Sequence, residues 1–168
     1  MCCASSIVRR IPGLVKLREE VSRDWSAVTG AVNPHARIVL PPGEGEMLRF
    51  GGLGVRFMIG GAQTGNTLAL VEHPIEPGTL AAPVRTHRHE GEYTFVLEGE
   101  IGGQIEDEVR IARPGDLVFK PRNVPHAFWN PAGKSSGLLE IISPAGFEQY
   151  FREIAPLLPQ PTMVRPLW

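Results

Sequence analysis

Short apolar runs of the β type, separated by glycine and proline, follow one another from about residue 36 onward. Runs of this length between turn residues are typical of strands in a sandwich or a barrel. They do not alternate with long helical segments, so a parallel α/β sheet is not expected. The pattern predicts strands at 36–40, 47–50, 54–59, 67–75, 92–98, 101–105, 108–112, 117–120, 125–129 and 137–142.

The two ends of the chain carry a different pattern. Residues 7–28 place apolar side chains at steps of three and four, which predicts a helix, and Pro12 limits how early a regular helix can begin. Residues 147–158 predict a second, short amphipathic helix. We therefore expect an N-terminal helical extension over 1–35, a barrel over 36–146, and a C-terminal helix and tail over 147–168.

Composition narrows the classes of protein without indicating a reaction. The 168 residues suffice for one hydrophobic core, and a net charge of −1 gives no sign of a nucleic-acid or anionic-membrane partner. No apolar run approaches the 18 residues of a membrane span. The only cysteines, Cys2 and Cys3, are adjacent and do not form a disulfide framework, so we expect a cytoplasmic protein.

Three of the five histidines lie in the two segments that carry the most organised pattern. The first segment, PVRTHRHEGEYTFVLEGEI, contains His87, His89 and Glu92. In an extended chain alternate side chains share a face, which would place Arg85 beside the two histidines. The second segment, PGDLVFKPRNVPHAFWN, adds His126 on a later strand. Imidazole with carboxylate is a donor set that suits Fe, Mn, Ni, Co or Zn, so we predict a divalent first-row metal as the cofactor.

These two segments resemble the two motifs of the cupin superfamily, and the wider sequence is similar to small bacterial single-domain cupins. Glu92 and Gly99 keep the spacing of the second half of the first motif. The second motif is matched at every interval, with Asn123 where glycine is usual, by Gly115, Pro121, His126 and Asn130. The resemblance implies an all-β fold, the double-stranded β-helix or jelly-roll barrel.

The first motif leaves two alternatives for the metal ligands. If the loop is shortened, His87, His89, Glu92 and His126 form a set of three histidines and one glutamate. If the usual interval before Glu92 is kept, Arg85 replaces one histidine and leaves two histidines and one carboxylate. That smaller set is still competent to bind a metal.

Arg85 and the residues near Glu92 offer further chemistry. A guanidinium cannot ligate a metal, but it can pair with a carboxylate or bind an anionic ligand. Glu92 could act as a general base and Tyr93 as a proton donor. Lys120 is expected to be solvated, and Glu140 to occupy a solvent-facing position. Most of the aromatic residues on the strands are expected in the core: Phe57, Phe95, Phe119, Phe128 and Trp129.

Three functions are compatible with these residues. The first is a metal-dependent enzyme, such as a dioxygenase or an isomerase, acting on a small organic substrate. The second is a non-catalytic module that binds or senses a small ligand in a barrel whose metal site is degraded. The third is a scaffold role. We expect a homodimer, a pattern common among cupins.

Overall fold

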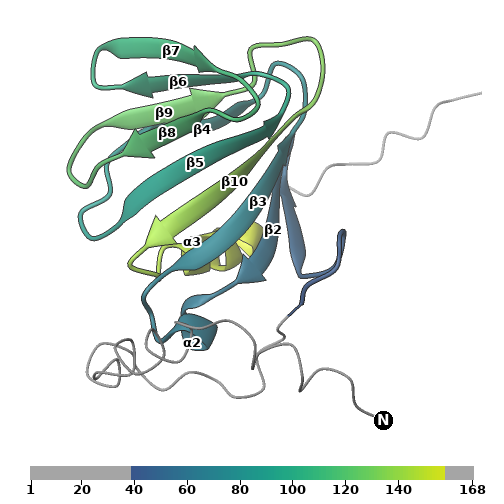
Figure 1. The fold of residues 1–168 in the computed structure, drawn as a ribbon, viewed down its shortest axis with the longest axis vertical. Coiled ribbons are helices and arrows are strands. Elements are labelled where there is room, and N and C mark those ends of the chain that lie inside the picture. Colours follow the sequence, from purple (N-terminus) through teal and green to yellow (C-terminus); the bar gives the residue numbers. More distant parts are fainter. Residues whose placement is uncertain (1–38, 158–168) are drawn as a thin grey trace, which may run out of the picture. The chain divides into compact units, whose positions relative to one another are not determined.

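Ten antiparallel strands form two facing sheets in the computed structural model, which describes residues 39–157. The larger sheet has six strands in the order β1-β2-β3-β10-β5-β8 (Figure 1). Its strands are β1 (Met47–Phe50), β2 (Leu53–Ile59), β3 (Ala69–Ile75), β10 (Ser136–Ser143), β5 (Gly91–Glu98) and β8 (Leu117–Lys120).

The smaller sheet has four strands in the order β4-β9-β6-β7. Its members are β4 (Leu80–Arg85), β9 (His126–Trp129), β6 (Ile101–Ile105) and β7 (Glu108–Ala112). Because consecutive strands such as β4 and β5, or β8 and β9, belong to different sheets, the chain crosses repeatedly from one sheet to the other. This confirms the predicted all-β barrel.

The strand prediction from the sequence missed β4. Pro83 interrupts the β pattern of residues 80–85, yet β4 is an edge strand, where a missing N–H is tolerated. The strand predicted at 36–40 is not formed at Val39 and Leu40, and residues 36–38 lie outside the described part of the chain.

The described helices are short and lie at the ends of strands. They are α2 (Gly61–Thr64), α3 (Glu148–Ile154) and a 3-10 turn, η3 (Ala155–Leu157). A carboxylate oxygen of Glu148 accepts a hydrogen bond from the backbone N–H of Gly61 at 3.0 Å, which ties α3 to α2. The C-terminal helix is thus confirmed, whereas the predicted extension over 1–35 lies outside the described residues. None of the described helices is long and apolar enough to cross a membrane.

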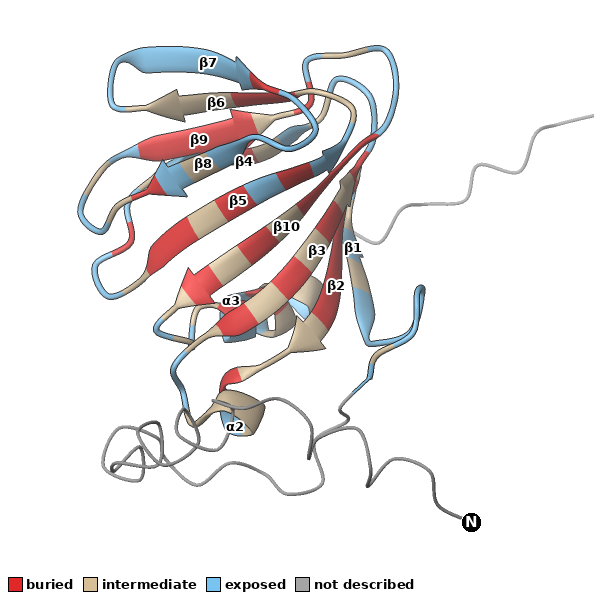
Figure 2. Cartoon of the chain, viewed as in Figure 1, coloured by how far each residue is buried: buried red, intermediate tan, exposed pale blue. Residues whose placement is uncertain are grey.

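The core lies between the sheets, as the alternating buried and exposed positions along the strands show (Figure 2). On β3 every second residue is buried, which places Val71 and His73 inside with Ile75. Gly99, the glycine of the first motif, has a φ of 70°, and a Cβ there would lie 2.5 Å from the Ser136 hydroxyl. Glycine is therefore required where β5 turns into β6.

His73 is a histidine of the core. Its Nδ1 lies 2.9 Å from the carbonyl oxygen of Gly54, so Nδ1 carries the hydrogen and donates. Its ring lies 5.5 Å from the ring of Phe151 and 6.1 Å from that of Phe128. Burial lowers the pKa of His73 from 6.5 to about 4. The imidazole is therefore neutral in the folded protein at neutral pH.

His73 should make the fold less stable as the pH falls from 6.5 to 4. In this window the unfolded chain takes up a proton at His73, while the folded chain, whose pKa is lowered, does not. The stabilising contribution is complete above pH 6.5 and is lost by pH 4, up to about 3 kcal/mol. Urea unfolding of the wild type and His73→Gln across this range should show a steeper loss in the wild type. If the free energy of unfolding falls equally with pH in both proteins, the pH dependence does not come from His73.

Candidate functional site

The candidate site lies between the two sheets and takes side chains from both. Glu92 on β5 and Lys120 on β8 are cross-strand partners in the larger sheet. Arg85 on β4 and His126 on β9 are partners in the smaller sheet. Because facing sheets direct alternate side chains inward, these two pairs meet in the barrel interior, and His87 joins them from the turn after β4.

The two sequence motifs are joined by a backbone hydrogen bond between their loops. The N–H of Asn123 donates to the carbonyl oxygen of His87 at 2.7 Å. Asn123 has a φ of 62°, the left-handed conformation that asparagine tolerates better than most residues. The asparagine that replaces the usual glycine is therefore compatible with the turn, and it helps to place His87 opposite His126.

Three buried side chains converge with metal-binding atoms. His87, Glu92 and His126 each offer a ligand atom, and these atoms all lie within 4.8 Å of one another. Nε2 of His87 is 3.3 Å from one oxygen of Glu92, and Nε2 of His126 is 3.4 Å from the other. This is a two-histidine, one-carboxylate set, the smaller of the two alternatives.

Nε2 of His126 is directed at Glu92. Its Nδ1 lies 3.0 Å from the carbonyl oxygen of Val124, which can only accept, so Nδ1 carries a hydrogen. Nε2 lies 3.4 Å from a carboxylate oxygen of Glu92, is buried, and has no hydrogen-bond partner within the described part of the chain. A proton or a metal ion bound at Nε2 would satisfy this atom.

Nε2 of His87 also faces Glu92, but this atom has a hydrogen-bond partner. Arg85 Nε donates to its Nε2 at 3.1 Å, so this nitrogen carries a lone pair. Burial lowers the pKa of His87, which favours the neutral ring that metal binding requires. The rings of His87 and His126 are stacked with centroids 5.1 Å apart. Nε2 of both rings therefore faces the same carboxylate.

Glu92 is the centre of charge of the site. Burial alone would raise its pKa, but Lys120, His126, Arg85 and His87 outweigh burial and hold the pKa well below its usual value. Lys120 Nζ is 2.8 Å from one carboxylate oxygen, and Arg85 Nη2 is 3.4 Å from the same oxygen. Glu92 is consequently ionised in the folded protein.

Lys120 and Glu140 belong to this cluster, contrary to the expectation from the sequence. Lys120 and Glu140 are each only 2% exposed, and Lys120 Nζ donates to Glu140 at 2.8 Å. The alternation of inward-facing and outward-facing positions along β8 and β10 does place both residues on the inner face. Lys120 follows Val118 by two positions, and Glu140 lies between Leu138 and the inward-facing Ile142. The sequence alone could not show that Lys120 and Glu140 meet, because this depends on which strands are neighbours in the sheet.

Two predicted residues lie outside the cluster. β4 ends at Arg85, so the extended conformation that would align His89 with Arg85 does not continue, and His89 is exposed. His89 is not one of the three grouped ligands. Tyr93 follows the inward-facing Glu92 and therefore points to the outer face, where its ring stacks on Phe119 at 4.7 Å. It does not face the pocket as a proton donor would.

A cavity of about 390 Å³ adjoins the cluster. It lies between α3 and the strands β1, β2, β4 and β9, and its wall is mainly apolar. Arg85 is the one charged side chain among its lining residues, and its guanidinium lies 5.5 Å from the ring of Phe128 and 5.8 Å from that of Phe147. Arg85 Nη1 is buried and has no hydrogen-bond partner among the described residues. The sequence had not indicated Phe147 as part of the site, although its ring lies 4.1 Å from that of His87.

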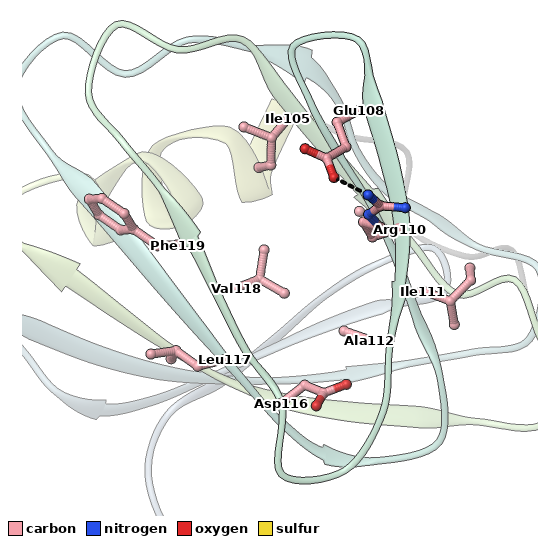
Figure 3. Close-up of a pocket in the computed structure, with 10 residues that line it drawn as sticks. Ile105, Glu108, Arg110, Ile111, Ala112, Asp116, Leu117, Val118 and Phe119 are labelled. Carbon is pink, nitrogen blue, oxygen red and sulfur yellow. Dashed lines mark ion pairs between the residues drawn. The ribbon is translucent and has the colours of Figure 1, made fainter.

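A second hollow, of about 370 Å³, lies between β7 and β8 (Figure 3). Its wall includes Leu117, Phe119 and Ile111, and an ion pair joins Glu108 to Arg110. None of its lining residues is a histidine. The hollow is therefore separate from the candidate metal cluster.

The residues fit a divalent metal, with one opposing feature. Two imidazoles and one carboxylate form a suitable donor set, and Nε2 of His126, which has no hydrogen-bond partner among the described residues, is the atom that a metal would satisfy. The opposing feature is that Lys120 and Arg85 already compensate the charge of Glu92. The three donors are present, but Lys120 and Arg85 also contact the carboxylate of Glu92.

Comparison with known proteins agrees with this geometry. A family model described as Cupin domain matches residues 72–142, which include every residue of the cluster. No curated protein matches the sequence. Many solved structures share the fold. An RmlC-like cupin from Shewanella frigidimarina is 21% identical with a TM-score of 0.57, over 68% of this chain and 96% of that one.

Two further structures are similar at comparable levels. KdgF from Halomonas sp. is 17% identical with a TM-score of 0.55, over 62% of this chain and 92% of that one. An Fe(II) form of HppE is 22% identical with a TM-score of 0.54, over 67% of this chain and 62% of that one. At these identities the likeness concerns the fold alone. Residues 72–142 match the cupin-domain family model, and the barrel that contains them has the cupin fold.

Proposed function

We propose that this cupin binds a divalent first-row metal ion, Fe, Mn, Ni or Zn, through His87, Glu92 and His126. The metal would serve an enzymatic reaction, such as a dioxygenation or an isomerisation, on a small organic substrate in the adjoining cavity. We place this activity in the cytoplasm, in keeping with the cysteine content. No role as a metal ligand is proposed for the exposed His89.

The observation that carries this proposal is the convergence of two imidazoles on one buried carboxylate. Each histidine presents Nε2 to a different oxygen of Glu92, at 3.3 and 3.4 Å. Nε2 of His126 is buried and has no hydrogen-bond partner among the described residues, and a bound cation would satisfy it.

The cavity supports a ligand that is mainly apolar and carries an anionic group. Its wall is apolar and aromatic, and Arg85 is the one charged residue that lines it. Arg85 has a spare buried donor, Nη1, and a guanidinium pairs well with a carboxylate. We infer that Arg85 orients a carboxylate-bearing substrate beside His87.

A bound metal of this kind supplies Lewis-acid or redox chemistry to the substrate. Glu92 contributes its charge to hold the ion, and its low pKa makes it a weak base. This favours Glu92 as a ligand over the general-base role. Phe147 and Phe128 cover Arg85 from two directions and reduce the access of water to the cluster.

A non-catalytic binding protein is the second candidate. The observation in its favour is that Arg85 Nε donates to Nε2 of His87, which uses the nitrogen that a metal would need. With Lys120 on Glu92 as well, the cluster is neutralised internally. In that case the cavity and Arg85 would bind a small anion as a carrier or a sensor.

Metal content discriminates between the two. The protein purified without chelators should contain close to one first-row ion per chain, measured by mass spectrometry of the metals. His126→Ala should weaken metal binding by about 10-fold or more, because it removes a ligand. His89→Ala is the matched control and should bind as the wild type does. Absence of any first-row metal in the wild type, even after incubation with each ion, would contradict the enzyme proposal.

Ligand class can be tested through Arg85. Aromatic and aliphatic monocarboxylates should raise the melting temperature of the wild type, whereas their primary amides should not. Arg85→Met should lose roughly 10-fold in carboxylate affinity, because one charge-assisted hydrogen bond contributes about 1.5–3 kcal/mol. Arg88→Met removes an exposed charge from the neighbouring turn and serves as the control. Equal binding of acids and amides would contradict the assignment.

We also propose that the outer face of the larger sheet forms a homodimer. Around Tyr93 this face exposes apolar side chains from two neighbouring strands, Phe95 and Leu97 on β5 and Leu117 and Phe119 on β8, each 39–60% exposed. Tyr93 is paired with Phe119, and Phe95 with Leu117, so the side chains form one continuous patch. Monomeric proteins rarely expose contiguous apolar surface of this kind.

A charge in this patch should dissociate the dimer. Light scattering after size exclusion should give the wild type about twice the 18.4 kDa of one chain. Phe119→Glu should reduce this to the mass of one chain, because a buried unpaired charge at the interface is costly. Val84→Lys, which alters an equally exposed apolar residue on the smaller sheet, should remain dimeric. A monomeric wild type would exclude the dimer.

A further inference from the structure

Lys120 is enclosed in the barrel interior between two carboxylates. Only 2% of its side chain is exposed; its Nζ donates to Glu140 at 2.8 Å and forms an ion pair with Glu92 at 2.8 Å. The ammonium also lies 4.8 Å from the centre of the Phe128 ring. A buried ammonium without such partners would be very costly, so each contact has an energetic role.

Glu140 is a second acceptor for Lys120 that lies outside the group of metal ligands. It is on β10, opposite Thr94 of β5, and the Thr94 hydroxyl donates to its carboxylate at 2.9 and 3.0 Å. Neither Glu140 nor Thr94 is one of the three grouped donors. Lys120 could therefore keep a buried carboxylate partner after losing Glu92.

One oxygen of Glu92 is the point of competition. Lys120 Nζ is 2.8 Å from Oε2, and Nε2 of His126 is 3.4 Å from the same atom. A metal that binds His126 and Glu92 must therefore approach the oxygen that already accepts from the ammonium. Like charges repel strongly in such a buried site, so the ion and the ammonium cannot share this oxygen at low cost.

We propose that Lys120 is the resident cation of the metal site and competes with the metal for Glu92. Glu140, oriented by Thr94, accepts Lys120 when the metal binds and so makes binding possible. Lys120 and Glu140 are positioning residues that set metal affinity in opposite directions. The inference rests on the proposed metal binding at His87, Glu92 and His126.

The test compares two substitutions whose effects should have opposite signs. Lys120→Met removes the competing charge and keeps the apolar stem, so it should tighten metal binding by roughly 10-fold or more. Glu140→Gln removes the second acceptor and leaves Lys120 dependent on Glu92, so it should weaken binding several-fold. Affinity for Zn²⁺ and Mn²⁺ is measured on the full chain by competition with a fluorescent chelator. Melting temperatures are recorded for each protein.

The control is Arg88→Met, which removes a positive charge from the exposed turn beside His87 and should leave the affinity unchanged. If Lys120→Met does not fold, Lys120→Gln takes its place with the same expected direction. A merely structural role for the pair would weaken metal binding in both variants, and this result would overturn the inference.

The outcomes separate this inference from the proposed function. If the wild type binds metal and the neutral Lys120 variant binds no more tightly, the competition is overturned while the metal site stands. If the wild type binds none and that variant does, the competition is supported and the proposed wild-type function fails. If no variant binds metal, the inference falls together with the site.

Discussion

The carboxylate of Glu92 is buried where the two sheets face each other, with Lys120, Arg85, His87 and His126 within 3.4 Å. An isolated buried charge would cost many kcal/mol, so these partners are a condition for folding as well as for chemistry. They come from β8, β4, the turn after β4, and β9. The charge therefore links elements from both sheets, and the interior at this point is organised around it.

The charged groups around this carboxylate compensate one another. Arg85 and Lys120 balance the charges of Glu92 and Glu140, so the interior has two cations for two carboxylates. Burial raises the pKa of Glu140, opposed by Lys120, whereas the pKa of Glu92 is lowered. The pKa values of the two carboxyl groups are thus shifted in opposite directions although both groups contact Lys120. The low pKa makes Glu92 the better candidate for a metal ligand.

The sequence was sufficient for the barrel and for bringing together three of the four residues predicted as metal ligands, because both rest on local patterns. Gly and Pro breaks delimit strands, and each motif places its histidine near a strand end. The local sequence pattern gave wrong predictions where the surroundings of a residue depend on which strands pair. Lys120 and Glu140 become partners only because β5 lies between β8 and β10. His89 was predicted on the inner face because the end of β4 at Arg85 could not be foreseen with β4 itself unrecognised.

The cavity beside the candidate metal cluster takes part of its wall from a later part of the chain. Phe147, Tyr150, Phe151 and Ile154 line it from the C-terminal helical segment, which Glu148 ties to α2. The three metal donors lie upstream, on or between the strands. Substitutions in the helix can therefore change which molecule enters without altering the donor atoms. The selectivity of the cavity and the composition of the candidate metal cluster can therefore change independently, the first through a single seven-residue helix.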